Sequence, residues 1–178
     1  KAVTGSYLFN SYGPSGSNFY PEAPQFLDLL FSYRKGWYLY TPLMLVATAG
    51  LFLPGRWIGK QRLAIGVYLI LQIYLLASWW SWWNGGSFGL RSFVDIYGVM
   101  AIPLAAAVEY GLGFRRIFRW VFLALLGFFL YLNQFQTWQY NKGVIHYSGM
   151  TREAYWLNFL KFKADGRFWH MLEIPDAQ

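Results

Sequence analysis

The sequence contains no cysteine, which excludes disulfide bonds, thiolate catalysis and cysteine-based metal sites. Charged residues are also scarce: they form 13 % of the chain, about half the fraction usual in soluble domains. The two histidines, His146 and His170, have no partner at metal-ligand spacing, so we interpret both as surface or hydrogen-bonded residues. The sequence therefore predicts neither a metal site nor a cofactor, and its low charge argues against a soluble domain.

Apolar and aromatic residues are abundant instead. Apolar residues make up 56 % of the chain and aromatic residues 22 %. Rings with an apolar body and a polar edge favour the boundary between lipid and water. The formal net charge is +7, carried by short basic clusters between apolar runs. This pattern favours membrane lipids with anionic headgroups as partners and argues against nucleic acid.

Four stretches, each free or nearly free of charge, have about the length needed to cross a bilayer. They cover residues 36–53, 63–80, 96–114 and 120–138. The pattern predicts an all-α fold, a polytopic helical membrane protein with about four transmembrane helices and short interfacial helices. Residues 1–35 then form an outer-face loop with an interfacial helix over 25–32, residues 36–138 the four-helix transmembrane region, and residues 139–178 an outer-face tail.

The tail is expected to hold an amphipathic helix. Thr151 can cap its start, and Glu153 lies in the first turn, where a carboxylate favours the helix dipole. Trp156 and Phe159 then share an apolar face with Leu160, which predicts a helix lying on the membrane surface.

The linkers between the apolar stretches predict the orientation. Linkers 54–62 and 112–119 contain cations and no acid; the cations are Arg56, Lys60, Arg62, Arg115, Arg116 and Arg119. Short loops of this kind face the cytoplasm. We therefore expect residues 84–95 and both termini on the opposite side, and Arg34 and Lys35 become cations that break the rule at the outer surface.

The densest feature is a segment that we call the tryptophan turn, residues 79–90, followed by Arg91 and Asp95. It contains Trp79, Trp80, Trp82 and Trp83 and the glycines Gly85, Gly86 and Gly89. One interpretation is an interfacial aromatic belt, a turn and an Arg91–Asp95 ion pair. The other is a phosphate site, because a cation at a helix start opposes the dipole unless an anion is nearby. In that case Arg91 binds an anionic headgroup, the glycines let the backbone approach it, and Trp82 or Trp83 stacks on a sugar ring.

The pair Arg34 and Lys35 also has two interpretations. Both side chains can extend to lipid phosphates at the membrane surface as ordinary interfacial cations. Alternatively, both join Arg91 in binding one specific lipid-linked phosphate, which the predicted topology allows because it places the two segments on the same side.

These segments resemble a known group of membrane enzymes. Leu-Phe-Ser-Tyr-Arg-Lys-Gly-Trp, then Tyr-Thr-Pro, then Trp-Trp-Asn-Gly-Gly-Ser-Phe-Gly-Leu-Arg-Ser-Phe is similar to the carboxyl-terminal half of bacterial GT-C glycosyltransferases related to protein mannosyltransferases. The resemblance covers roughly residues 7–104. It implies a polyprenyl-phosphate-linked sugar donor, chemistry on the periplasmic face of the bacterial inner membrane, and a catalytic acid in an outer loop that nothing in this sequence matches.

The resemblance, with Lys1 in first position, predicts a carboxyl-terminal fragment of a longer chain that is inactive alone. The alternative is a non-catalytic membrane scaffold or transporter fragment, in which the tryptophan turn is only an interfacial belt. Among the remaining acids, Glu109 is expected to extend to the cytoplasmic surface. Glu22 and Asp28 are interpreted as solvated outer-face acids, with a general-base role as the open alternative.

Overall fold

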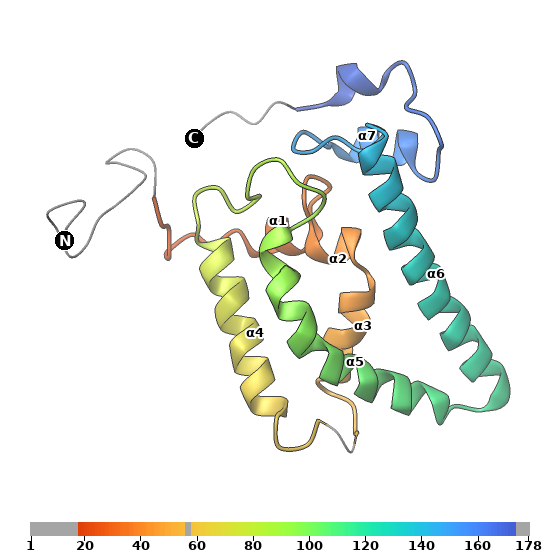
Figure 1. Ribbon diagram of the computed structural model, residues 1–178. Coiled ribbons are helices and arrows are strands. Elements are labelled where there is room, and N and C mark those ends of the chain that lie inside the picture. The colour runs from red at the N-terminus through yellow and green to blue at the C-terminus, as the bar shows by residue number, and fades with distance from the viewer. Residues whose placement is uncertain (1–17, 56–57, 174–178) are drawn as a thin grey trace, which may run out of the picture.

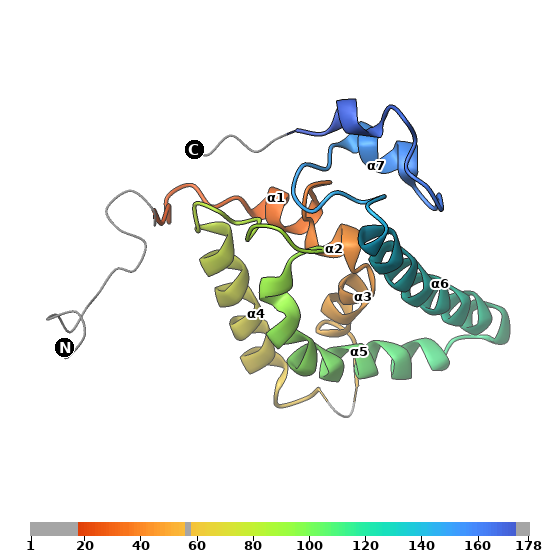
Figure 2. The same ribbon diagram turned by 45° about the horizontal axis from the view of Figure 1, so that its top comes forward.

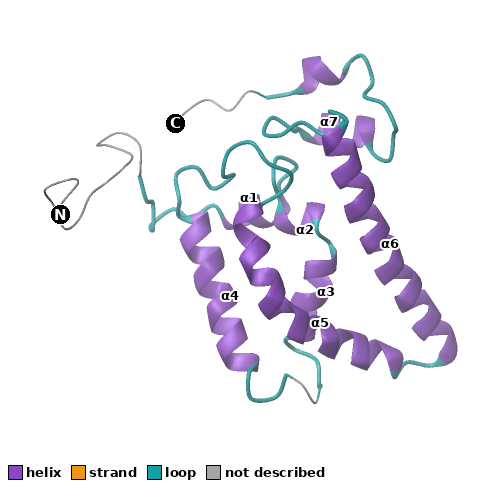
Figure 3. Cartoon of the chain, viewed as in Figure 1, coloured by secondary structure: helices purple, strands orange, loops and turns teal. Residues whose placement is uncertain are grey.

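The computed structural model describes residues 18–55 and 58–173, and these residues are all-helical apart from one isolated bridge between Phe19 and Trp79 (Figure 1, Figure 3). The elements in chain order are α1 (Phe26–Phe31), α2 (Trp37–Tyr40), α3 (Leu43–Gly50), α4 (Arg62–Ala77), the 3-10 helix η1 (Arg91–Ile96), α5 (Tyr97–Leu112), α6 (Arg116–Asn141), α7 (Arg152–Asn158) and the 3-10 helix η2 (Phe168–Met171). The all-α prediction is confirmed, and α1 forms within the predicted range 25–32.

Two helical segments are long and apolar enough to cross a membrane: the 22 residues of η1 and α5, and the 26 residues of α6. Both coincide with predicted spans. Helix α4 lies in a third predicted span, but its 16 residues extend over only about 24 Å. In α6, only 6 % of the most apolar window is buried, which is unlike the core helix of a soluble protein. Its exposed side chains include Phe118, Trp120, Val121 and Leu130.

The first predicted span differs from a single helix. Residues 36–53 form α2, of four residues, and α3, of eight, with Thr41 in a non-helical conformation between them. The cause is local, because a residue that precedes proline is disfavoured in the helical region and Pro42 follows Thr41. A continuous helix over 36–53 is therefore wrong, and α3 alone is about 12 Å long.

Helices α3, α4 and α5 form the packed body, and α6 leans away from it (Figure 1, Figure 2). The tryptophan turn, α1 and the tail lie at one end of this body. The linker before α4 and the turn between α5 and α6 lie at the other end (Figure 1). At that second end Lys60, Arg62, Arg115 and Arg116 are all exposed.

The tail packs on the protein through buried polar groups. Gln136 Nε2 of α6 donates to the Tyr155 hydroxyl at 2.7 Å, and Gln139 Nε2 donates to the Asn158 carbonyl at 2.9 Å. The side chain of Asn158 in turn donates to the Val144 carbonyl at 3.1 Å. Buried amides need such partners, so these bonds fix the tail to the end of α6.

The predicted cap of the tail helix is confirmed, because the Thr151 hydroxyl accepts from the Ala154 N–H at 3.1 Å. The predicted helix is too long, because α7 ends at Asn158, before Phe159 and Leu160. Ala154 and Tyr155 are buried against the protein, and Trp156 is 54 % exposed.

The closest approach between α3 and α5 occurs at Gly50. A Cβ atom at this position would overlap the carbonyl oxygen of Pro103, a backbone atom that cannot rotate away. We expect Gly50→Ala to separate the helices and to lower the free energy of unfolding by about 1–3 kcal/mol. The check is the melting temperature of the purified protein in detergent.

The matched control is Gly66→Ala in α4, where a Cβ atom meets no heavy atom within 4 Å. Alanine favours a helix over glycine by about 1 kcal/mol, so this variant should melt at the same or a higher temperature. Equal melting temperatures for both variants would contradict the tight crossing at Gly50.

Candidate functional site

Lys35 is a buried cation at the end of the body that carries the tryptophan turn. Its side chain is 1 % exposed. The ammonium donates to the Ser87 hydroxyl at 3.0 Å and also to the Ser87 carbonyl oxygen. Among the described residues no carboxylate forms an ion pair with it. Burial of a charge without a paired opposite charge is costly, so Lys35 is the most unusual charged group at this end of the molecule.

The backbone conformation of the tryptophan turn holds Ser87 within hydrogen-bonding distance of the Lys35 ammonium. Gly85 and Gly89 have φ angles of 66° and 53°, in the left-handed region that glycine tolerates. Asn84 also has a positive φ of 51°, and its side chain donates to the Ser92 hydroxyl. The Ser87 hydroxyl donates to the Gly89 carbonyl at 3.1 Å. The turn thus directs two oxygen acceptors toward the Lys35 ammonium.

Arg34 lies between the turn and the tail. Its Nε donates to the Ser148 carbonyl at 2.9 Å, and its guanidinium carbon is 4.0 Å from the centre of the Trp83 ring. One terminal nitrogen, Nη2, is buried and has no hydrogen-bond partner among the described residues. Burial lowers the pKa of Arg34, against the opposing effects of Glu173 and Asp28.

Arg91 completes a cluster of three cations, which we call the cation cluster: Arg34, Lys35 and Arg91. Arg91 is the first residue of η1, is exposed, and forms no ion pair with Asp95. The ion-pair interpretation of Arg91 and Asp95 is therefore wrong. Burial and the nearby positive charges of Arg34 and Arg91 together lower the pKa of Lys35 to about 8. Lys35 thus lies within electrostatic range of both Arg34 and Arg91.

The cluster has the chemistry of an anion site. Like charges raise the energy of the empty cluster, and a bound anion would relieve both this repulsion and the unpaired burial of Lys35. A guanidinium provides several directed donors and an ammonium provides a compact charge, a combination suited to phosphate.

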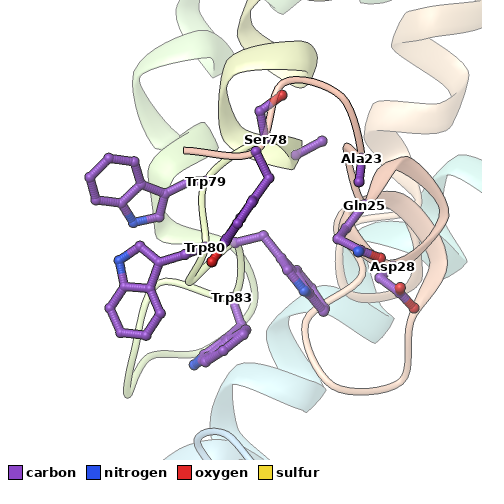
Figure 4. Close-up of a pocket in the computed structure, with 10 residues that line it drawn as sticks. Ala23, Gln25, Asp28, Ser78, Trp79, Trp80 and Trp83 are labelled. Carbon is purple, nitrogen blue, oxygen red and sulfur yellow. The ribbon is translucent and has the colours of Figure 1, made fainter. Parts of the chain in front are cut away.

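A pocket of about 370 Å³ adjoins the cluster. Its lining includes Gln25, Asp28, Trp79, Trp80, Trp82 and Trp83. Trp79, Trp80 and Trp83 lie across it from Gln25 and Asp28 (Figure 4). Because Arg34 lies over the ring of Trp83, this ring is shared by the pocket and the cation cluster. Aromatic faces opposite an amide and a carboxylate suit a polyhydroxylated ring with one apolar face.

The other residues considered in the sequence analysis differ in whether they line the pocket or lie near the tryptophan turn. Trp82 lines the pocket but is only 8 % exposed, with its ring edge-on to Trp83. At Gly86 the close neighbour is the Tyr147 side chain, whose Cδ2 would be 3.1 Å from an added Cβ. Glu22 and Glu109 are exposed and do not line this pocket.

Several site residues were missed because nothing in the local sequence marks them. Ser148 contributes through its carbonyl oxygen, which every residue type has, and Ser87 through its carbonyl and hydroxyl oxygens. His146 is predicted to be a surface or hydrogen-bonded residue, and its Nδ1 does accept two backbone hydrogen bonds. The sequence does not show that the charge of Lys35 helps to lower its pKa. Asp28 lines the pocket, which the pattern left open between a solvated acid and a base.

The fold and the site together define an all-helical protein with two helices suited to a membrane and a cation cluster beside an aromatic pocket. No family model matches the chain, and neither a curated protein nor a solved structure is similar to it. The geometry of the cluster and pocket therefore carries the functional conclusions.

The lowered pKa of Lys35 predicts how affinity would depend on pH if the cation cluster binds an anion. In the free site Lys35 loses its charge as pH rises through about 8, whereas a bound anion holds it protonated. We therefore expect the affinity for farnesyl phosphate to fall by up to about tenfold per pH unit above pH 8. The check is a binding titration of the full-length protein in detergent micelles between pH 7 and 10.

Two variants serve as controls for this pH dependence. Lys35→Arg keeps its charge over the whole range and should show a weaker decline. Lys35→Met should bind weakly at every pH. His146 does not contribute, because its pKa is lowered from 6.5 and the imidazole stays neutral throughout. A wild-type affinity that is constant from pH 7 to 10 would contradict a role for the Lys35 charge.

Proposed function

We propose that the chain is the carboxyl-terminal membrane part of a bacterial glycosyltransferase that uses a polyprenyl-phosphate-linked sugar donor. The observation that carries the proposal is the burial of the Lys35 cation without an acidic partner in the described chain, within electrostatic range of Arg34 and Arg91. The proposed ligand of this cluster is the phosphate of the donor lipid. The resemblance of the same segments to GT-C enzymes supports the proposal independently.

The adjoining pocket supports a phosphate-linked sugar over a phosphate alone. A sugar attached to the bound phosphate would extend past Trp83, which borders both the cluster and the pocket. Trp79, Trp80 and Trp83 offer aromatic surfaces, and Gln25 and Asp28 offer hydrogen-bond partners for hydroxyl groups (Figure 4). The proposed division is thus phosphate at the cations and sugar at the tryptophans.

The proposed reaction is an inverting transfer. The acceptor hydroxyl oxygen attacks the anomeric carbon, its proton passes to an acidic residue elsewhere in the longer chain, and the bond from the anomeric carbon to the phosphate oxygen breaks. The electron pair stays on the departing polyprenyl phosphate. Arg91, with Arg34 or Lys35, stabilises the negative charge that develops there.

The proposed membrane arrangement follows from the two ends of the helical body. We propose that α4, the η1–α5 segment and α6 cross the bacterial inner membrane, with α2 and α3 packed in the same layer in place of a fourth simple span. Lys60, Arg62, Arg115 and Arg116 then face the cytoplasm. The tryptophan turn, the cation cluster and the tail face the periplasm, where polyprenyl-phosphate headgroups are accessible at the surface.

Replacement of Arg91 tests the function. Arg91→Ala in the full-length protein should lower turnover with a polyprenyl-phosphate-linked sugar by about 10²–10³-fold, by analogy with the loss of one oxyanion donor. Arg152→Ala is the matched control, because Arg152 is also an exposed arginine at the start of a helix at the same end of the molecule. Unchanged turnover in Arg91→Ala, with the control equally active, would favour the scaffold alternative.

The absence of cysteine makes the topology directly testable. Single cysteines at Lys60 and Lys142, both exposed and at opposite ends of the body, can be labelled with a membrane-impermeant maleimide. In intact spheroplasts we expect labelling of Lys142→Cys, with Lys60→Cys labelled only after the membrane is permeabilised. Equal labelling of both positions in intact spheroplasts would disprove the arrangement.

A further inference from the structure

The loop that precedes α7, residues 144–150, lies against the cation cluster. The Ser148 carbonyl accepts from Arg34 Nε, and the Tyr147 ring lies beside Gly86 of the tryptophan turn. Lys35 acts electrostatically on His146. Residues 146–148 of the tail therefore lie close to Arg34, Lys35 and the tryptophan turn. In the chain, Ser148 and Arg34 are 114 positions apart.

The imidazole of His146 is held in one orientation. Its Nδ1 accepts from the backbone N–H of Gly149 at 2.9 Å and from that of Ser148 at 3.3 Å. The imidazole packs on Tyr147 with the ring centroids 4.2 Å apart, and the backbone N–H of His146 donates to the Met150 sulfur at 3.3 Å. Because Nδ1 is an acceptor, the proton of the neutral ring lies on Nε2.

His146 is therefore a neutral donor within electrostatic range of Lys35. Burial and the charge of Lys35 lower its pKa, so the ring carries no charge near pH 7. Its Nε2–H has no hydrogen-bond partner in the part of the chain that the structure describes. A neutral donor adds a hydrogen bond to an anion without adding to the repulsion among Arg34, Lys35 and Arg91.

We infer that His146 is a binding residue of the anion site, and that its Nε2–H donates to an oxygen of a phosphate group held by the cation cluster. This inference rests on the proposed function, since it requires that the cluster binds a phosphate. It adds the tail as a fourth contributor to the site, after the segment before α2, the tryptophan turn and η1. Asp28 and Glu173 are the acids whose charges act on Arg34.

Two substitutions separate this role from a purely structural one. Asn at position 146 can place its carbonyl oxygen where Nδ1 accepts from the loop backbone, but it provides no donor at the Nε2 position. Gln can place its amide nitrogen near the Nε2 position, but it does not replace the Nδ1 acceptor. A ligand-binding role therefore predicts loss in His146→Asn and recovery in His146→Gln, whereas a loop-organising role predicts the reverse.

The experiment measures affinity of the full-length protein in detergent micelles for farnesyl phosphate and, separately, for inorganic phosphate, by tryptophan fluorescence. His146→Asn should bind farnesyl phosphate at least about tenfold more weakly, the effect of one hydrogen bond to a charged group. His146→Gln should stay within about threefold of the wild type. Weakening with both probes supports recognition of phosphate from either source, and weakening with farnesyl phosphate alone supports a lipid phosphate.

Lys35→Met distinguishes failure of this inference from failure of the proposed function. If Lys35→Met loses binding while His146→Asn binds normally, the role of His146 is overturned and the cluster stands. Loss in His146→Gln, with or without loss in His146→Asn, also overturns it, because the donor restored by Gln must recover binding. Unchanged binding in Lys35→Met would overturn both.

Discussion

The interaction on which the site depends is the pair of hydrogen bonds from the Lys35 ammonium to Ser87. These bonds make burial of the cation tolerable, but they leave its charge unpaired within the described chain. The neutral Ser87 oxygens replace the hydrogen bonds to water that the ammonium loses on burial. They do not neutralise its charge, so the positive electrostatic potential of the cation cluster remains. The conformations of Gly85 and Gly89 in the tryptophan turn therefore have an electrostatic consequence, because they position the oxygens that keep a charged side chain inside the protein.

Hydropathy predicted the two longest helical segments well, since both are long and apolar enough to cross a membrane. It failed at 36–53, where the Thr41-Pro42 step breaks the helix within a stretch that remains uniformly apolar. It also failed for the end of α7, which stops at Asn158, and it could not show that Tyr155 bonds to Gln136 on a distant helix. The composition of a segment shows how apolar it is, but the packing of the folded chain decides which residues it contacts.

The site was predictable to a similar degree. Arg34, Lys35 and Arg91 stood out because they are cations in positions where local rules disfavour them. Their neighbours Ser148 and His146 did not, because their roles arise from contacts across more than a hundred residues. The sequence could single out these three cations without indicating every group that surrounds them.

The bond between Arg34 and Ser148 joins segments 114 positions apart. One segment precedes α2 and the other follows α6, so every long helix of the described chain is made between them. During synthesis, the side of the cluster formed by residues 146–148 is therefore missing until the last of these helices is in place. In the nascent chain Arg34, Lys35 and Arg91 are synthesised before residues 146–148. The site can therefore assemble fully only after all the long helices have been synthesised.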